Sequence, residues 1–191
     1  MKRLFRYISS IVVALVLGIA SAWLAIGSNL PSIQNGAWHY DPLVGSVAAD
    51  PYLRARVAKV GLLALKNSEA LYFFAATDDQ GSPLRCEQTY RIEGKDFDCR
   101  WWSITAYDED DFLIPNDQER YSYNMANLER NADGRYTIIL SRSPRLGNWI
   151  PTGAGQTFSV VLRIYNPAPA VRDNIRALAL PQIIREEGRH D

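Results

Sequence analysis

The chain has 191 residues, of which 47% are hydrophobic and 22% are charged, a composition typical of a folded domain. Because 21 basic side chains are balanced by 21 acidic ones, no net field draws the molecule to nucleic acid. These values exclude a disordered chain and a strongly basic nucleic-acid-binding protein, and they suit one ordinary domain with an appended segment.

The N-terminus carries an uncharged, mostly apolar run over residues 7–26, long enough for a helix to cross a bilayer. Three basic residues precede it: Lys2, Arg3 and Arg6. Positive charge before the run predicts a cytoplasmic N-terminus. We therefore expect residues 1–27 to be a single-pass inner-membrane anchor, with the following domain in the periplasm. A cleaved signal peptide is the alternative, since Ala20-Ser21-Ala22 resembles a cleavage site, and both readings export the domain.

Residues 28–49 are rich in Gly, Ser, Asn and Pro and show no clear period, so we expect a tether, with Trp38 and Tyr40 packing back on the domain. A helix is predicted over residues 50–67, where Asp50 suits the N-cap position and Pro51 the first turn. Its apolar residues recur three or four apart, as in a helix that covers one side of a core.

From about residue 70 to 166, short runs rich in aromatic and β-branched residues alternate with turn residues. This pattern predicts a mainly β domain, an antiparallel β-sandwich or jelly-roll-like body of about six to eight strands. Together with the flanking helix, the domain is expected to span residues 50–168. Residues 169–191 show no strong period and are expected to form a C-terminal tail.

Two cysteines, Cys86 and Cys99, enclose a segment with a turn-like centre at Glu93-Gly94. If the chain is exported, an oxidising compartment lets such a pair persist as a disulfide across a hairpin. The crosslink would add about 3 kcal/mol to the free energy of unfolding. Two buried free thiols are the alternative. The pair is not C-x-x-C and no histidine lies near it in sequence, which argues against a redox or metal role.

Several motifs follow one another between about residues 50 and 168: DPYLRARVAKVG, EALYFFAATDDQGSPL, YRIEG, RWWSITAYD, FLIPN, RYS, NADGRYTI, GNWIPTG and LRIYNP. In these motifs the chain resembles the bacterial domain of unknown function 1214 family. The resemblance implies a β-rich, sandwich-like domain behind a single N-terminal membrane helix, in an uncharacterised envelope protein. It implies no activity and no catalytic position, because the family has no agreed biochemical function.

No catalytic residue is predicted. His39 lies in the expected tether and His190 is the penultimate residue, so neither suits the base of a nucleophilic triad or a zinc site. The acidic run Asp108–Asp111 offers oxygen ligands for calcium, but it lacks the EF-hand pattern and is expected to be a solvated loop. We expect no metal and no cofactor. A glycosidase-like carboxylate pair, distant in sequence, stays open.

Alternation along two predicted strands separates a core face from a mixed one. The expected core residues are Trp102, Ile104, Ala106, Phe158, Val160, Leu162 and Ile164. The opposite faces combine hydroxyls, aromatic rings and one arginine, and Trp149 is expected on a loop nearby. The predicted ligand-binding residues are Trp101, Ser103, Tyr107, Trp149, Arg163 and Tyr165. Such groups suit a sugar, a carboxylate or a peptide edge. The alternatives are cross-strand pairs that only stabilise the sheet, or a face covered by the helix.

The functional hypothesis is a membrane-anchored periplasmic β-sandwich module that binds an envelope protein or a glycan. Because the sequence predicts no catalytic residues, we favour this non-catalytic role over an enzyme. The alternative is an envelope hydrolase that uses paired carboxylates or a metal. No nucleic-acid partner is expected.

Overall fold

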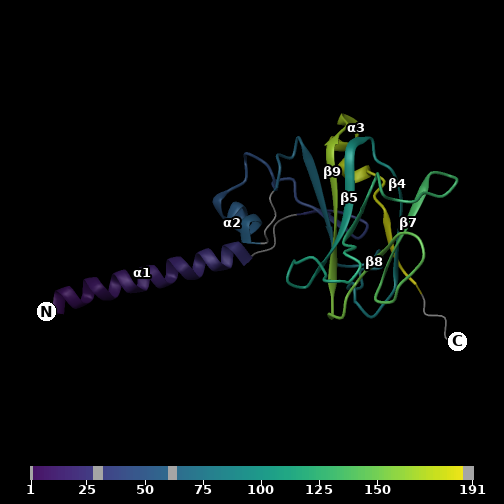
Figure 1. Cartoon of the computed structure of the whole chain (residues 1–191). Coiled ribbons are helices and arrows are strands. Elements are labelled where there is room, and N and C mark those ends of the chain that lie inside the picture. The colour runs from purple at the N-terminus through teal and green to yellow at the C-terminus, as the bar shows by residue number, and fades with distance from the viewer. Residues whose placement is uncertain (1, 28–31, 60–63, 187–191) are drawn as a thin grey trace.

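The computed structural model describes residues 2–27, 32–59 and 64–186, and it shows a β-sandwich with one long helix projecting from it (Figure 1). One sheet has six strands, in the spatial order β1 (Ile33–Asn35), β2 (Trp38–Tyr40), β3 (Ala70–Ala75), β9 (Phe158–Pro167), β5 (Cys99–Asp108) and β6 (Ser122–Asn124). The other has four, in the order β10 (Gln182–Arg185), β4 (Tyr90–Lys95), β7 (Arg135–Ser141) and β8 (Trp149–Pro151). The predicted mainly β, antiparallel sandwich is confirmed.

The core lies between the sheets and follows the predicted alternation. All seven expected core residues of the two long strands, β5 and β9, are buried. The Trp102 ring stacks on Tyr136 of β7 at a centroid distance of 5.0 Å, which joins the two sheets. Burying an aromatic or branched side chain contributes about 1.5–3 kcal/mol, so this apolar layer is the main stabilising feature of the domain.

Helix α2 (Pro51–Lys59) begins where the sequence predicts and ends earlier. The Asp50 carboxylate accepts the backbone N–H groups of Tyr52 (2.7 Å) and Leu53 (3.1 Å), as an N-cap does. Residues 64–67, the end of the predicted helix, are not helical, and residues 60–63 lie outside the described part.

Helix α1 (Lys2–Gly27) is long and apolar enough to cross a membrane, and none of its candidate span is buried against the domain. It measures about 39 Å at 1.5 Å per residue. Near its end, the ammonium group of Lys59 in α2 lies 5.1 Å from the centre of the Trp23 ring.

Both segments expected to be irregular contribute strands. β1 and β2 fall within residues 28–49, and the Trp38 indole N–H donates to the Pro181 carbonyl oxygen (2.7 Å). Trp38 and Tyr40 are buried, as expected. Residues 169–191 contain α3 (Pro169–Arg172), the 3₁₀ turn η1 (Ile175–Ala177) and β10. Strands of three or four residues are too short to display a period in the sequence.

The predicted hairpin between the cysteines is wrong, and the disulfide is not formed. β4 pairs with β7 and β10, not with the chain after Gly94. The Cys86 amide N–H donates to Gln156, just before β9, whereas Cys99 lies opposite Pro167 at the other end of β9. That strand separates the thiols by about 30 Å, while a disulfide needs Cα atoms within about 7 Å. Both are free thiols, and burial raises the pKa of Cys99 to about 11.

Candidate functional site

The two strands predicted to offer a mixed face are neighbours, so their outer residues adjoin. The register places Trp101 opposite Tyr165, Ser103 opposite Arg163, and Tyr107 opposite Ser159. We call the outer residues of these strands the mixed face: Trp101, Ser103, Thr105, Tyr107, Ser159, Val161, Arg163 and Tyr165. Five of the six predicted ligand-binding residues therefore share one surface.

Arg163 lies at the centre of the mixed face and is held by uncharged groups. Its guanidinium donates to the Tyr107 hydroxyl (2.7 Å) and to Thr105 Oγ1 (3.4 Å), and lies 5.4 Å from the centre of the Tyr107 ring. No carboxylate of the described residues forms an ion pair with it. The arginine is thus oriented while its charge remains uncompensated, as in a site that receives an anionic or strongly polar group.

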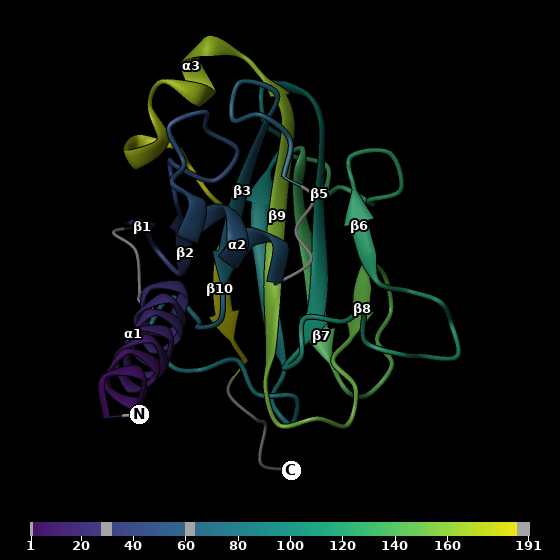
Figure 2. The same cartoon turned by 90° about the vertical axis from the view of Figure 1, so that its left-hand side faces the viewer.

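The mixed face is covered on one side and open on the other. Tyr72 of β3 lies beside Arg163, is buried, and accepts the backbone N–H of Leu65 on its hydroxyl (3.0 Å). Figure 2 shows α2 crossing in front of β9, while no helix of the described chain lies over β5 and β6. Trp101 is 38% exposed. The alternative of a helix that covers this face therefore holds for its β3 and β9 side, where Val161 is buried, whereas the β5 side is open at Trp101.

Trp149, the sixth predicted residue, does not join the mixed face. It lies in β8 of the other sheet, is only 4% exposed, and donates its indole N–H to the Ser141 carbonyl (3.1 Å) and hydroxyl (3.0 Å). The expectation of a loop position is wrong because the chain after Gly147 enters a short parallel strand against β7.

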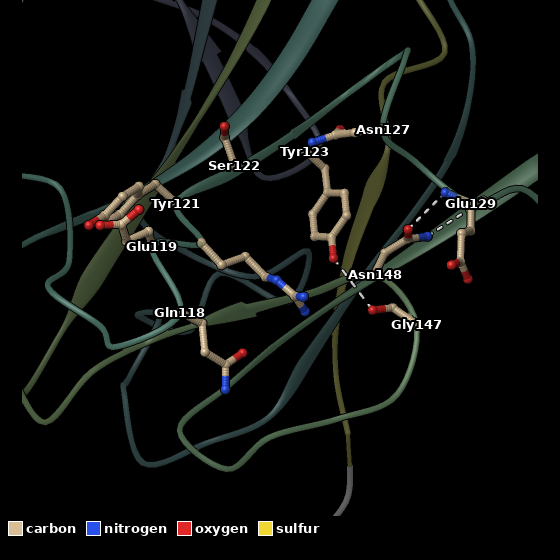
Figure 3. Close-up of a pocket in the computed structure, with 10 residues that line it drawn as sticks. Gln118, Glu119, Tyr121, Ser122, Tyr123, Asn127, Glu129, Gly147 and Asn148 are labelled. Carbon is tan, nitrogen blue, oxygen red and sulfur yellow. Dashed lines mark hydrogen bonds between the residues drawn. The ribbon is translucent and has the colours of Figure 1, made fainter.

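A second candidate site, missed by the sequence analysis, is a polar pocket of about 500 Å³ (Figure 3). It is lined by Gln118, Glu119, Arg120, Tyr121, Ser122, Tyr123, Asn127, Glu129, Gly147 and Asn148. These residues come from β6, the loops beside it and the chain that leads into β8. Since β6 and β8 are edge strands of the two sheets, the pocket lies at the edge of the sandwich.

Hydrogen bonds fix the inner wall of the pocket. The Tyr123 hydroxyl accepts the backbone N–H of Trp149 (3.1 Å) and lies 3.4 Å from the Gly147 carbonyl oxygen. The Asn148 side chain exchanges two hydrogen bonds of 2.8 Å with the Glu129 backbone. In Figure 3, Glu119 and Tyr121 lie on the side opposite Asn148. Because both Tyr123 and Asn148 are buried and engaged, this wall is rigid.

Arg120 is the basic residue of the pocket, and its guanidinium lies 5.8 Å from the centre of the Trp149 ring. Asn116 holds its backbone, accepting the Arg120 N–H on Oδ1 (2.9 Å) and donating to its carbonyl (3.1 Å). Among the described residues, no ion pair involves this guanidinium. Arg120 lies in the motif RYS, and Gly147 and Asn148 begin the motif GNWIPTG. The sequence predicted no binding role for them, because the pocket forms only where these two segments meet.

The acidic turn and His39, which were also considered from the sequence, form local hydrogen bonds. Asp108 accepts the backbone N–H groups of Asp110 (3.0 Å) and Phe112 (2.9 Å), so it stabilises the acidic turn itself. His39 lies in β2 with Nδ1 3.4 Å from the Ser32 hydroxyl, and His190 lies outside the described residues. Within the described ranges, no three His, Cys, Asp or Glu side chains group as metal ligands do.

Comparison with known proteins gives a family and a fold. Residues 69–169 match the model of a family described as "Protein of unknown function (DUF1214)". The solved structure of the VPA0106 protein from Vibrio parahaemolyticus is similar, with 23% identity and a TM-score of 0.60. A second structure, of an uncharacterised protein from Burkholderia cenocepacia, has 16% identity and a TM-score of 0.44.

At 23% identity, the likeness to the VPA0106 structure supports the fold alone. The matches cover 73% and 89% of this chain but 36% and 40% of those proteins, so the chain spans well under half of their length. No curated protein sequence matches.

Proposed function

The chain belongs to the DUF1214 family, a family of unknown function, and we propose that it is a membrane-anchored module whose mixed face binds a glycan or a protein of the cell envelope. The observation that carries the proposal is the position of Arg163 between Tyr107 and Tyr165, beside the exposed Trp101. Aromatic rings with polar tips and a planar guanidinium are the groups that recognise sugars and carboxylates.

The residues exposed on the mixed face favour a glycan over a protein. A stable protein interface buries about 1,200–2,000 Å² in total and usually centres on several large apolar anchors. On the mixed face, Trp101 is the aromatic residue that exposes more than a third of its surface. Its neighbours there, Ser103 and Arg163, are half-buried and polar. One exposed ring beside several polar groups suits a sugar ring better than a protein partner, which needs several large apolar anchors.

The membrane part of the proposal is supported by α1 and by the charge before it. Arg3 and Arg6 flank the cytoplasmic end in the proposed topology, and no charged residue interrupts the run from Tyr7 to Ile26. The mixed face is on the side of the domain where α2 meets the end of α1 (Figure 2). The bound glycan would therefore be held close to the membrane surface.

The hydrolase alternative has one observation in its favour, since Glu119 and Glu129 both line the polar pocket. A glycosidase needs a pair of carboxyl groups across the scissile bond, one of them kept protonated by withdrawal from water. Both glutamates are exposed. The geometry therefore supports binding better than hydrolysis.

The proposal is tested by measuring binding of the full chain, reconstituted in nanodiscs, to an array of envelope glycans and then by calorimetry with the best ligand. We expect Trp101→Ala to weaken binding at least about tenfold, equivalent to ~1.4 kcal/mol, without lowering the melting temperature appreciably. Tyr52→Ala, which removes an exposed aromatic residue of α2, should bind as the wild type does. Unchanged affinity of the Trp101 variant, or an array and an envelope pull-down that are both blank, would sink the proposal.

A further inference from the structure

We propose that the pocket of Figure 3 is a second binding site, in which Arg120 binds the carboxylate of an acidic sugar. The inference goes beyond the role of the mixed face and does not depend on it. Ser122 lines the pocket and pairs with Thr105 of the mixed face, so the two surfaces adjoin at β6. Arg120 and Trp149, however, belong to the edge of the sandwich, and within the described chain their side chains form no hydrogen bond with the mixed-face residues.

Arg120 is prepared to bind a carboxylate. Asn116 fixes its backbone through two hydrogen bonds, and the buried Trp149 ring supports its guanidinium. A guanidinium placed over a ring keeps its in-plane N–H groups available, and those groups match the two oxygens of a carboxylate. Within the described residues, neither a hydrogen bond nor an ion pair occupies them. The entropic cost of ordering the arginine is thus met before a ligand arrives.

The remaining lining selects the rest of the ligand. All lining residues except Gly147 have polar side chains. This polar lining excludes an apolar ligand. Glu119 and Glu129 form no ion pair within the described chain, so their carboxylates can accept hydroxyl groups. Two negative side chains also oppose a ligand with several negative charges, such as a phosphate ester. One carboxylate on a hydroxyl-rich body satisfies both conditions.

The size of the pocket agrees with this class of ligand. Small-molecule sites have volumes of about 300–1,000 Å³, and about 500 Å³ is available here. Tyr123 and Asn148, held by hydrogen bonds, form one wall of this space, and Tyr121 lies on the side opposite Asn148 (Figure 3). A single acidic sugar unit or the end of an acidic chain fits this space.

The test uses the full chain in micelles with ¹⁵N-labelled tryptophan indoles, whose Trp149 signal is assigned from the Trp149→Phe variant. The probes are D-glucuronate, its neutral counterpart D-glucose, and acetate, which has the carboxylate without the hydroxyls. We expect glucuronate to shift the Trp149 signal at millimolar concentration and to bind at least about tenfold more tightly than glucose or acetate. Arg120→Gln should remove that preference, whereas Arg145→Gln, on the neighbouring exposed loop, should not.

Three results would overturn the inference: no shift of Trp149 up to about 50 mM glucuronate, equal affinity for glucose or acetate, or unchanged affinity in Arg120→Gln. If that variant also moves the other four indole signals, Arg120→Lys is measured instead. Lysine keeps the positive charge but lacks the planar guanidinium that can bind both carboxylate oxygens. A loss of at least about fivefold in the affinity for glucuronate therefore supports the inference, and an unchanged affinity contradicts it. Trp101→Ala should leave the Trp149 response intact, which separates this site from the mixed face.

Discussion

Asp96 illustrates how one polar residue connects the core to the surface. Its Oδ1 accepts the indole N–H of the buried Trp102 (2.9 Å), and its two oxygens accept Arg130 N–H groups at 2.8 and 2.9 Å. The hydrogen bonds from Arg130 and, to a lesser degree, from Trp102 lower the pKa of Asp96 below its ordinary value. The folded protein therefore stabilises the ionised carboxylate of Asp96 more than the unfolded chain does.

This lowered pKa predicts acid sensitivity. The stabilisation is present above the unfolded value of about 3.9 and is lost as the pH falls through the lower folded value. We expect Asp96→Asn to be less stable than the wild type at pH 7, by about 1 kcal/mol because the side chain is 41% exposed and partly screened. The difference should shrink between about pH 4 and pH 2, as measured by thermal unfolding followed by circular dichroism.

Asp98→Asn is the matched control, because Asp98 is exposed and Trp102 and Arg130 donate their hydrogen bonds to Asp96 instead. It should leave the melting temperature nearly unchanged at both ends of the pH range. Identical pH profiles for Asp96→Asn and the wild type would show that the Arg130–Asp96–Trp102 link contributes nothing to stability.

At the scale of the element, the strands at the sheet edges decide how much of the chain is needed for folding. β10 pairs with β4 in full register, and Ile183 is fully buried, whereas its neighbour Ile184 is half-buried on the opposite face. The backbone N–H of Ile183 also donates to Asp79 Oδ2 (2.9 Å), near the end of β3. The segment after residue 169 thus contributes to the core.

We predict that Ile183→Ala lowers the free energy of unfolding by about 2–5 kcal/mol, as expected for a large-to-small change in a core. Ile184→Ala should cost less than about 1.5 kcal/mol, because part of that side chain already contacts water. Urea unfolding of the two variants compares them directly. Equal losses would mean that the Ile183 face of the edge strand β10 is not packed in the core.

The disulfide that was predicted but is not formed also belongs to this scale. A short segment between two cysteines suggests a local hairpin, but Tyr90–Lys95 pairs with β7, which begins 40 residues later at Arg135. Local turn residues cannot reveal such a pairing. Gly94 shows what the long-range contact requires, because a Cβ atom there would lie 2.6 Å from the Tyr136 hydroxyl oxygen. The glycine is needed for sheet packing, not for a hairpin turn.

At the scale of the whole molecule, α1 sets the proposed location of everything else. It projects from the domain with its apolar side chains exposed (Figure 1), which in water would be unfavourable and in a bilayer is not. The exposed apolar surface of α1 therefore favours the interpretation that the protein is membrane-anchored, with its folded domain on one side of the bilayer.

We predict that a C-terminal alkaline phosphatase fusion of the full chain is active and that the protein resists alkaline extraction from the inner membrane. Leu15→Arg together with Leu17→Arg should reduce insertion, since an arginine at the centre of a span costs about 2.5–3.5 kcal/mol. The same changes at the exposed Val47 and Leu65 should leave insertion unaltered. An inactive fusion beside an active cytoplasmic reporter would contradict the export of the domain.

The sequence alone was sufficient for features that depend on local pattern. Alternation in RWWSITAY and TFSVVLRIY identified both the core residues and the outer residues of β5 and β9. Asp50 and Pro51 marked the start of α2, and the uncharged run marked α1. Each of these signals resides in side chains a few residues apart, whose directions the backbone geometry of a strand or helix dictates.

Only the tertiary structure decided which distant segments meet. It placed β5 beside β9, set Trp149 in the opposite sheet, separated the cysteines along β9, and brought Arg120 over Trp149 at the edge of the sandwich. Such contacts depend on which strands pair and on how two sheets align. Their energy comes from burial shared across the whole core, so no short stretch of residues encodes them.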